Sequence, residues 1–138
     1  MHRLEEMSSP ALDALDRERT VALLTVSPLE EHGPTCPSAW TRSPLATSPR
    51  RSPSGWWLAA PAGRSILLPT LHLGSFTFET VGTISVRQRV VRDVMVDYGE
   101  ALARSGFRFI LVANGHGGPG HLTALDEAAA IVSAATAS

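Results

Sequence analysis

Short apolar runs predict three buried strands in this chain, at residues 21–26 (VALLTV), 65–69 (SILLP) and 107–113 (FRFILVA). Runs of this length, bounded by polar, Pro or Gly residues, favour strands over helices. Between the second and third runs, apolar residues recur at helical spacing from 86 to 104. This stripe predicts an amphipathic helix with one face packed on the sheet.

Both ends of that helix carry sequence signals. Ser85 and Gln88 fit a capping box at its start, and Gly106 fits the left-handed residue that often follows a helix end. Shorter helices are predicted at 10–19 and 121–134. A long helix between two strands suits the right-handed crossover that joins parallel strands. We therefore expect an α/β fold, a three-layer α/β/α sandwich with a mainly parallel sheet.

The segment at 35–63 differs in composition from the rest. It is rich in Pro, Ser, Arg and Trp, contains no acidic residue, and shows neither helical nor strand periodicity. Proline removes backbone donors that helices and sheets need, and such a segment has little means of burying itself. We expect a single partial domain over 1–138, in which 35–63 is irregular or disordered.

Overall composition narrows the class of protein. Apolar residues make up 43% of the 138 residues and charged residues 18%, which is compatible with a globular core. The formal net charge of -1 argues against binding to nucleic acid or to an anionic membrane. The chain has one cysteine, Cys36, and we find no apolar run long enough to span a bilayer and no secretory signal. We expect a cytoplasmic protein that binds neither nucleic acid nor membrane.

Metal-ligating side chains occur in two loops that follow predicted strands. Glu30 and His32 follow the first strand, and His116 follows the third. Because the carboxyl ends of parallel strands open on one edge of the sheet, these loops can converge there. Carboxylate and imidazole groups are ligands of Zn²⁺ and, with more oxygen donors, of Mn²⁺. Residues around His116 that allow backbone to approach a substrate form a candidate substrate-adjacent loop: Asn114, Gly115, Gly117 and Gly118.

Each of these loops alone is also compatible with an ordinary surface turn, since turns use Gly and Asn for conformational reasons. His72 and His121 are interpreted as partly exposed, hydrogen-bonded histidines and not as ligands. Cys36 has no neighbour in sequence that would activate a thiol. The pattern therefore assigns no catalytic residue.

Three segments taken together, VALLTVSPLEEHGP, LHLGSFTFETVGTISV and FRFILVANGHGG, resemble the creatininase (creatinine amidohydrolase) family. The resemblance implies an α/β/α sandwich with a divalent metal, Zn or Mn, at the carboxyl ends of the strands. It also implies hydrolysis of linear or cyclic amide C–N bonds through a metal-activated water, a small amide substrate and a homo-oligomer. The family motifs E-x-H-G-P and N-G-H imply that Glu30, His32 and His116 are metal ligands.

Departures from the family pattern concern the second metal and the substrate pocket. The bridging Asp of the family corresponds to Thr41, and the carboxylate that some members carry after N-G-H corresponds to Gly118. The C-terminal part of the family, which carries much of the pocket, is expected to be absent. We therefore expect a metal-dependent amidohydrolase with impaired activity; the alternatives are a catalytically inactive fragment and a metal-binding module without hydrolysis.

A shift of reading frame offers an explanation for the unusual segment. The family motif continues as HLPLGVDA, and codons for these residues read one base out of frame encode TCPSAWTR, which matches residues 35–42. We interpret 35 to about 63 as an apparent out-of-frame stretch; the alternative is a genuine insertion. Resequencing of the gene decides between the two.

Overall fold

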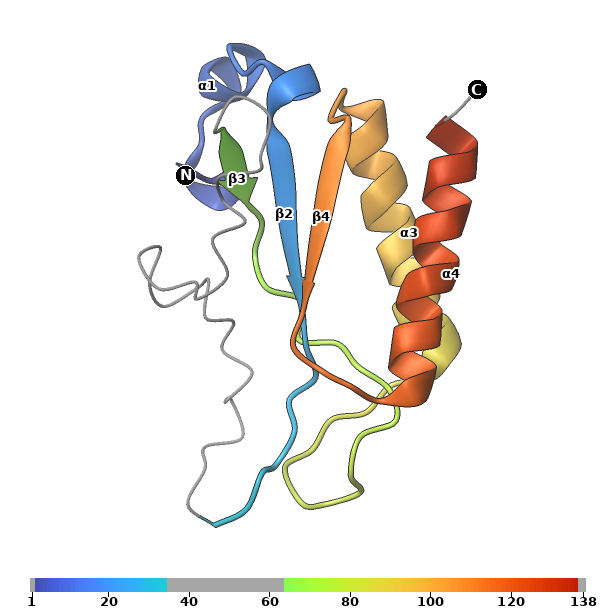
Figure 1. The fold of residues 1–138 in the computed structure, drawn as a ribbon. Coiled ribbons are helices and arrows are strands. Elements are labelled where there is room, and N and C mark those ends of the chain that lie inside the picture. Colours follow the sequence, from blue (N-terminus) through green and yellow to red (C-terminus); the bar gives the residue numbers. More distant parts are fainter. Residues whose placement is uncertain (1, 35–63, 137–138) are drawn as a thin grey trace.

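The computed structural model describes residues 2–34 and 64–136, which form one parallel sheet with helices (Figure 1). Its strands are β1 (His2–Arg3), β2 (Val21–Val26), β3 (Ser65–Leu67) and β4 (Phe109–Asn114). They lie in the order β1-β3-β2-β4, and every pair is parallel. The predicted irregular stretch at 35–63, with Cys36 and Thr41, lies outside the described residues.

Strand β2 is buried along its whole length, as expected for a strand covered by neighbours on both sides. Its pairing with β4 runs from Val21 beside Phe109 to Val26 beside Asn114. The Gly115 N–H then donates to the Val26 carbonyl oxygen at 3.0 Å. The chain segments that follow β2 and β4 therefore leave the sheet side by side, at the edge where ligands bind in such folds.

Two long helices, α3 (Gln88–Arg104) and α4 (Pro119–Thr136), cover one face of the sheet and pack against each other (Figure 1). Alternate residues of β2 meet their apolar stripes, because successive strand side chains point to opposite faces. A smaller cluster of Leu23, Leu67 and Ala113 lies on the other face. The buried residues of the main core are Ala22, Leu24, Val26, Ile66, Leu68, Val91, Met95, Leu102, Phe107, Ala124 and Ala128.

The predicted fold class is confirmed, and several element boundaries are corrected. The strand at 21–26 matches β2, and Gly106 has the predicted left-handed backbone, with φ of 91°. The helix predicted at 10–19 is instead two pieces, α1 (Ser9–Asp13) and the 3-10 helix η2 (Arg17–Arg19). Neither piece has a buried residue, so little packing offsets the cost of a continuous helix. The strand β1 and the 3-10 helix η1 (Leu4–Glu6) were not predicted.

The predicted capping box at the start of α3 does not form. The helix begins at Gln88 with Arg87 as its N-cap, and no side chain caps it. The N–H of Val86 donates to the carbonyl oxygen of Gly74 at 2.8 Å. This contact ties the preceding residues to the loop after β3, and so a tertiary hydrogen bond replaces the local capping geometry.

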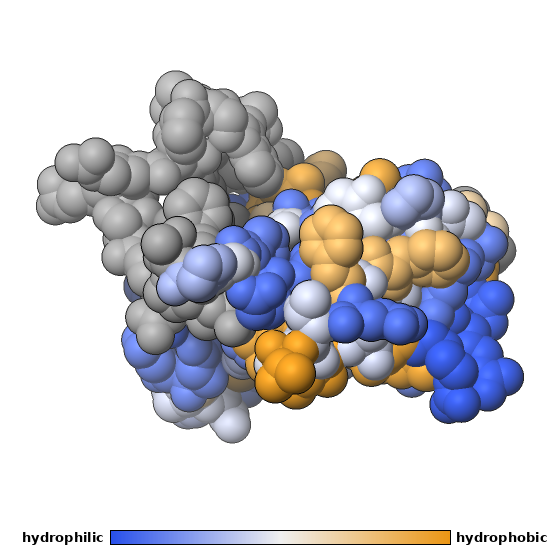
Figure 2. Space-filling view, turned by 90° about the horizontal axis from the view of Figure 1, so that it is seen from below, coloured by the Kyte–Doolittle hydropathy of each residue, from blue (hydrophilic) through white to orange (hydrophobic). Residues whose placement is uncertain are grey.

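The rim at the carboxyl ends of the strands exposes large apolar side chains, which Figure 2 shows from below. The most exposed of them belong to the loop between β3 and α3: Phe76, Phe78, Val81 and Ile84. On β4, Phe109 and Leu111 are also exposed. In the part of the chain that the structure describes, no helix is both long and apolar enough to cross a membrane.

Candidate metal centre

Glu30 occupies a buried position just beyond β2. Its side chain is 5% exposed, and its Oε1 accepts a hydrogen bond from the Phe78 N–H at 2.9 Å. The chain is held there by an isolated antiparallel bridge between Leu29 and Ile84. A buried carboxylate is costly unless a positive charge or strong donors compensate for the lost water. The groups recorded as ion-pair partners of Glu30 within the described ranges are two histidines.

His116 is the nearer of these two partners. Its Nδ1 lies 3.3 Å from Glu30 Oε2, and its side chain is 10% exposed. The other ring nitrogen, Nε2, lies 3.0 Å from the carbonyl oxygen of Ser75. A carbonyl oxygen only accepts hydrogen bonds, so Nε2 carries the proton. In the neutral ring Nδ1 is therefore a bare lone pair that faces a carboxylate oxygen.

His32, two residues after Glu30 in the same loop, approaches the same carboxylate oxygen. Its Nε2 lies 3.8 Å from Glu30 Oε2, while its Nδ1 lies 2.9 Å from the carbonyl oxygen of Glu30. By the same argument Nδ1 carries the proton, and in the neutral ring Nε2 presents a lone pair to the carboxylate. The side chain of His32 is 41% exposed, so it forms the open side of the cluster.

These three side chains are the ones that the sequence predicts as metal ligands, and the structure brings them together. Donor atoms around a tetrahedral zinc are about 3.3 Å apart, given Zn–N bonds of about 2 Å. The observed separations from Glu30 Oε2 are 3.3 Å to His116 and 3.8 Å to His32. Histidines that bind metal commonly donate their second ring nitrogen to a backbone carbonyl, as both rings do here. The donor chemistry therefore fits a divalent cation.

In residues 2–34 and 64–136, however, no group of three or more His, Cys, Asp or Glu side chains is already arranged to hold a metal ion. The 3.8 Å approach of His32 is the longer of the two contacts, and this ring is also the exposed one. A rotation of an exposed ring is easier than a shift of the buried Glu30 and His116. The assignment of the three ligands stays a prediction.

Asn114 shapes the loop that carries His116. Its Nδ2 donates to the His116 carbonyl oxygen at 2.6 Å, and its Oδ1 accepts from the His116 N–H at 3.0 Å. The same Oδ1 lies 3.0 Å from Nε2 of His121. Of the residues predicted for a substrate-adjacent loop, Asn114 thus has a visible role in holding the loop, and substrate contact is untested.

His121 departs from its sequence-based interpretation. It is hydrogen-bonded as predicted, but it is fully buried and not partly exposed. Burial lowers its pKa from the usual value to about 4, and His116 lowers it further whenever that ring is protonated. Its ring packs edge-on against His116, with centroids 5.2 Å apart and planes at 70°. His72 is exposed, and its interpretation as a hydrogen-bonded non-ligand stays a prediction.

Two backbone groups that the sequence motifs do not indicate orient the proposed ligands. The Ser75 carbonyl and the Phe78 N–H, both from the loop before α3, orient His116 and Glu30. Between them, Phe76 adopts a left-handed backbone with φ of 60°, an unfavourable conformation for a bulky residue. A non-glycine residue in this region is a signal of a constrained site. Sequence alone does not show it.

Gly118 stands against the ring of His116. A Cβ at this position would clash with His116 Nε2 and would lie 2.8 Å from the Phe76 carbonyl oxygen and 2.9 Å from that of Ser75. A side chain here therefore cannot fit unless the loop that orients His116 moves. The carboxylate that some members of the resembling family carry at this place has no room in this structure.

We expect Gly118→Ala to displace His116 from Ser75 and to destabilise the fold by about 1–3 kcal/mol, the usual cost of overpacking. Thermal unfolding of the metal-free protein measures the loss. Gly117→Ala is the matched control, because a Cβ at Gly117 meets nothing within 4 Å. Equal unfolding temperatures for the two variants would contradict the close packing at Gly118.

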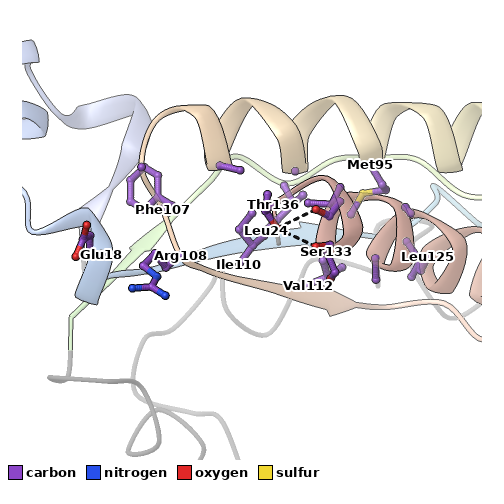
Figure 3. A pocket seen from close by; sticks show the side chains of 16 residues that line it. Glu18, Leu24, Met95, Phe107, Arg108, Ile110, Val112, Leu125, Ser133 and Thr136 are labelled. Carbon is purple, nitrogen blue, oxygen red and sulfur yellow. Dashed lines mark hydrogen bonds between the residues drawn. The ribbon is translucent and has the colours of Figure 1, made fainter. Parts of the chain in front are cut away.

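A separate pocket of about 540 Å³ lies between β4 and the two long helices (Figure 3). Figure 3 shows apolar side chains from the sheet and helices around it, with Glu18 and Arg108 at one end. Glu30, His32 and His116 are not among its lining residues. The pocket is therefore distinct from the candidate metal centre.

Comparison with known proteins provides independent information. The family model "Creatininase: Creatinine amidohydrolase" matches residues 5–138. Among solved structures, "Creatininase Mn" is 22% identical, with a TM-score of 0.76 over 96% of this chain and 51% of that chain. "Crystal structure of creatinine amidohydrolase (creatininase)" is 23% identical, with a TM-score of 0.74 over 94% of this chain and 50% of that chain. A mutant creatininase of "Zn-Zn type" is 20% identical, with a TM-score of 0.71 over 94% and 50%.

These likenesses define how far the comparison reaches. The chain spans about half the length of the solved structures that it matches. At such identities the structures show a shared fold. No curated protein sequence matches the chain significantly.

Proposed function

The chain belongs to the creatininase family, and from this premise we propose that it is a metal-dependent amidohydrolase acting on a small linear or cyclic amide. The observation that carries the proposal is the arrangement around Glu30. In their neutral forms, two imidazoles point lone pairs at one buried carboxylate oxygen, and both donate their other nitrogen to backbone. Lone pairs and a carboxylate repel each other unless a cation or a proton lies between them. A divalent cation held between the three groups would remove this repulsion.

The proposed ligands are Glu30, His32 and His116, and the proposed cofactor is Zn or Mn. Solved structures of the same fold include a creatininase described with Mn and another of Zn-Zn type, which supports this choice. Such an ion, when bound, lowers the pKa of a coordinated water and polarises an amide carbonyl. Three protein ligands leave a position open, as in catalytic zinc sites. Because the His32 side chain is 41% exposed, an ion held by these three residues would be reachable from solvent.

The chain's own residues then fix the site and admit the substrate. The Phe78 N–H holds the carboxylate of Glu30, and Ser75 holds His116, so the two buried ligands need little reorganisation. Gly117 has open space around its α-carbon, which allows backbone of the loop to approach a small amide. A solved mutant creatininase is described as complexed with creatine, which supports a small substrate of this class.

A second candidate function, a metal-binding module without hydrolysis, is favoured by the packing at Gly118. This position has no room for a carboxylate. With Glu30, His32 and His116 all assigned as ligands, Glu30 is the carboxylate recorded as an ion-pair partner of the two histidines in the part of the chain that the structure describes. The module would bind one ion and lack a group to relay a proton to the leaving nitrogen.

The predicted homo-oligomer also stays a prediction; the exposed apolar rim in Figure 2 is compatible with it.

Measurement of metal binding and then of amide hydrolysis tests the proposal. We expect the metal-free protein to bind Zn²⁺ or Mn²⁺ with one ion per chain by calorimetry. The loaded protein should then hydrolyse small amides from a panel: creatinine by ring opening to creatine, and formamides to formate with release of ammonia or amine. His32→Ala and His116→Ala should each abolish hydrolysis above the background rate, because each removes a ligand.

His72→Ala is the matched control, since His72 is an exposed histidine of the same chain. It should bind and hydrolyse as the wild type does. Metal binding without turnover of any amide would favour the module over the hydrolase. Hydrolysis that persists in both His32→Ala and His116→Ala would refute the site assignment, and absence of metal binding would refute both functions.

A further inference from the structure

His121 lies at the first turn of α4, outside the predicted ligand set, and yet it is fully buried beside His116. We propose that His121 is a positioning residue that fixes the loop of His116 through the side-chain amide of Asn114. The inference rests on the proposed function for its meaning, since the group that it positions is a candidate metal ligand. Its geometry stands without a metal.

The orientation of the Asn114 amide follows from its partners. The His116 carbonyl oxygen can only accept, so the Asn114 atom 2.6 Å from it is the Nδ2 donor. The opposite atom, Oδ1, then accepts from the His116 N–H at 3.0 Å. Asn114 thus grips both backbone groups of His116. A flip of the amide would place donor against donor and acceptor against acceptor.

His121 adds a third contact that holds the amide in this orientation. Because Asn114 Oδ1 accepts, the His121 Nε2 that lies 3.0 Å from it must carry a proton and donate. The His121 Nδ1 is buried and has no hydrogen-bond partner among the described residues, so Asn114 is its one recorded hydrogen-bond contact. A fully buried ring cannot exchange this bond for one to bulk water.

The helix that carries His121 makes the constraint rigid. α4 packs along α3, and Ala124 and Ala128 anchor it in the main core. The His121 ring also meets the His116 ring edge-on at 5.2 Å. A rigid helix therefore holds the Asn114 amide, and the amide holds the backbone that aims His116 Nδ1 at Glu30. Outer partners of this kind commonly change metal affinity by about 10–100-fold when they are removed.

Two variants separate the hydrogen bond from packing. His121→Phe keeps an aromatic ring beside His116 but has no N–H. His121→Gln places an amide donor close to the position of the lost Nε2. His72→Phe, at an exposed histidine, is the control for the same chemical change.

The first readout needs no metal. Hydrogen exchange of the His116 amide, followed by NMR in the metal-free full chain, reports on the bond to Asn114 Oδ1. We expect His121→Phe to accelerate this exchange by about 10-fold or more, which corresponds to about 1.4 kcal/mol of lost protection. Exchange in His121→Gln and His72→Phe should stay within a few-fold of the wild type. Unchanged exchange in His121→Phe overturns the proposal.

The second readout is the affinity for Zn²⁺ by calorimetry, together with the absorption spectrum of Co²⁺ as a probe of ligand geometry. We expect His121→Phe to weaken Zn²⁺ binding by about 10–100-fold and to alter the Co²⁺ spectrum, and His121→Gln to restore both. If His121→Phe does not fold, His121→Asn replaces it, because its shorter side chain cannot reach Asn114 and must show the same two defects.

The outcomes distinguish this inference from the proposed function. A wild-type chain that binds no metal refutes the metal centre, and the exchange measurement then judges the positioning of the His116 loop alone. A wild-type chain that binds Zn²⁺ with the same affinity as His121→Phe refutes the positioning role and leaves the metal centre in place. Failure of His121→Gln to restore exchange shows that packing, and not the hydrogen bond, holds the loop, and this too overturns the proposal.

Discussion

Glu30→Gln is expected to lower the affinity of the chain for Zn²⁺ by more than about 100-fold, the upper range for loss of an outer partner, because it removes a ligand itself. The same change is expected to leave the metal-free protein as stable as the wild type or more stable. Glutamine keeps its Oε1 on the Phe78 N–H, whose bond to Glu30 is 2.9 Å long. Its amide nitrogen can donate to Nδ1 of His116, which faces Glu30 Oε2 at 3.3 Å.

The two opposite effects discriminate between a metal centre and a plain ion pair. If a protonated His116 and Glu30 merely formed a salt bridge, loss of the carboxylate charge would destabilise the protein by leaving a charge buried and unpaired. Calorimetry with Zn²⁺ and thermal unfolding of the metal-free protein give the two numbers. Glu79→Gln, an exposed carboxylate of the neighbouring loop, is the matched control and should change neither. A Glu30→Gln protein that is clearly less stable and still binds Zn²⁺ would contradict the metal-centre interpretation.

Leu24→Ala is expected to cost about 3 kcal/mol of unfolding free energy, because it opens a cavity in the core. Leu24 is 1% exposed and lies in the main cluster with Val91 and Met95. For a domain of this size, such a loss lowers the unfolding temperature by about 10 °C. Leu24 also lines the pocket beside α4, so the new space adds to an existing hollow and does not collapse easily.

Leu122→Ala provides the comparison for this change. Leu122 is 42% exposed on α4, and the same truncation should cost less than about 1 kcal/mol there. Urea unfolding of both variants, followed by circular dichroism, gives the difference in stability. Similar losses at Leu24 and Leu122 would show that the core does not lie between β2 and α3 as the structure places it.

The sequence predicts the elements whose signal is both local and strong. Residues 21–26 are apolar except for Thr25, and they form β2 with the predicted bounds. Residues 10–19 carry a helical signal with few apolar positions, so the segment breaks into α1 and η2 once packing decides. At Ser85 the local capping pattern loses to the hydrogen bond between Val86 and Gly74, a contact that no local pattern contains.

The candidate site divides in a similar way. Glu30, His32 and His116 were predicted because side-chain type and the parallel sheet together place them at one rim. The groups that orient them were not predicted, because they are backbone atoms of the loop before α3, at Ser75 and Phe78. Burial of His121 also depends on how α4 meets the sheet end. The sequence motifs indicate which residues are candidate ligands, whereas the orientation of these side chains depends on the tertiary structure.

The parallel register of β2 with β4 has a consequence for how the proposed metal centre would form. Glu30 and His116 are 86 residues apart in the sequence and meet only when Val26 pairs with Asn114. An unfolded chain thus holds no preformed ligand pair across these strands, and distant segments of chain are slow to find each other. An ion that binds only the folded state would stabilise the pairing of these two strands. This stabilisation would increase with the concentration of free metal by mass action. The metal would stabilise a sheet that has already formed and would not direct its folding.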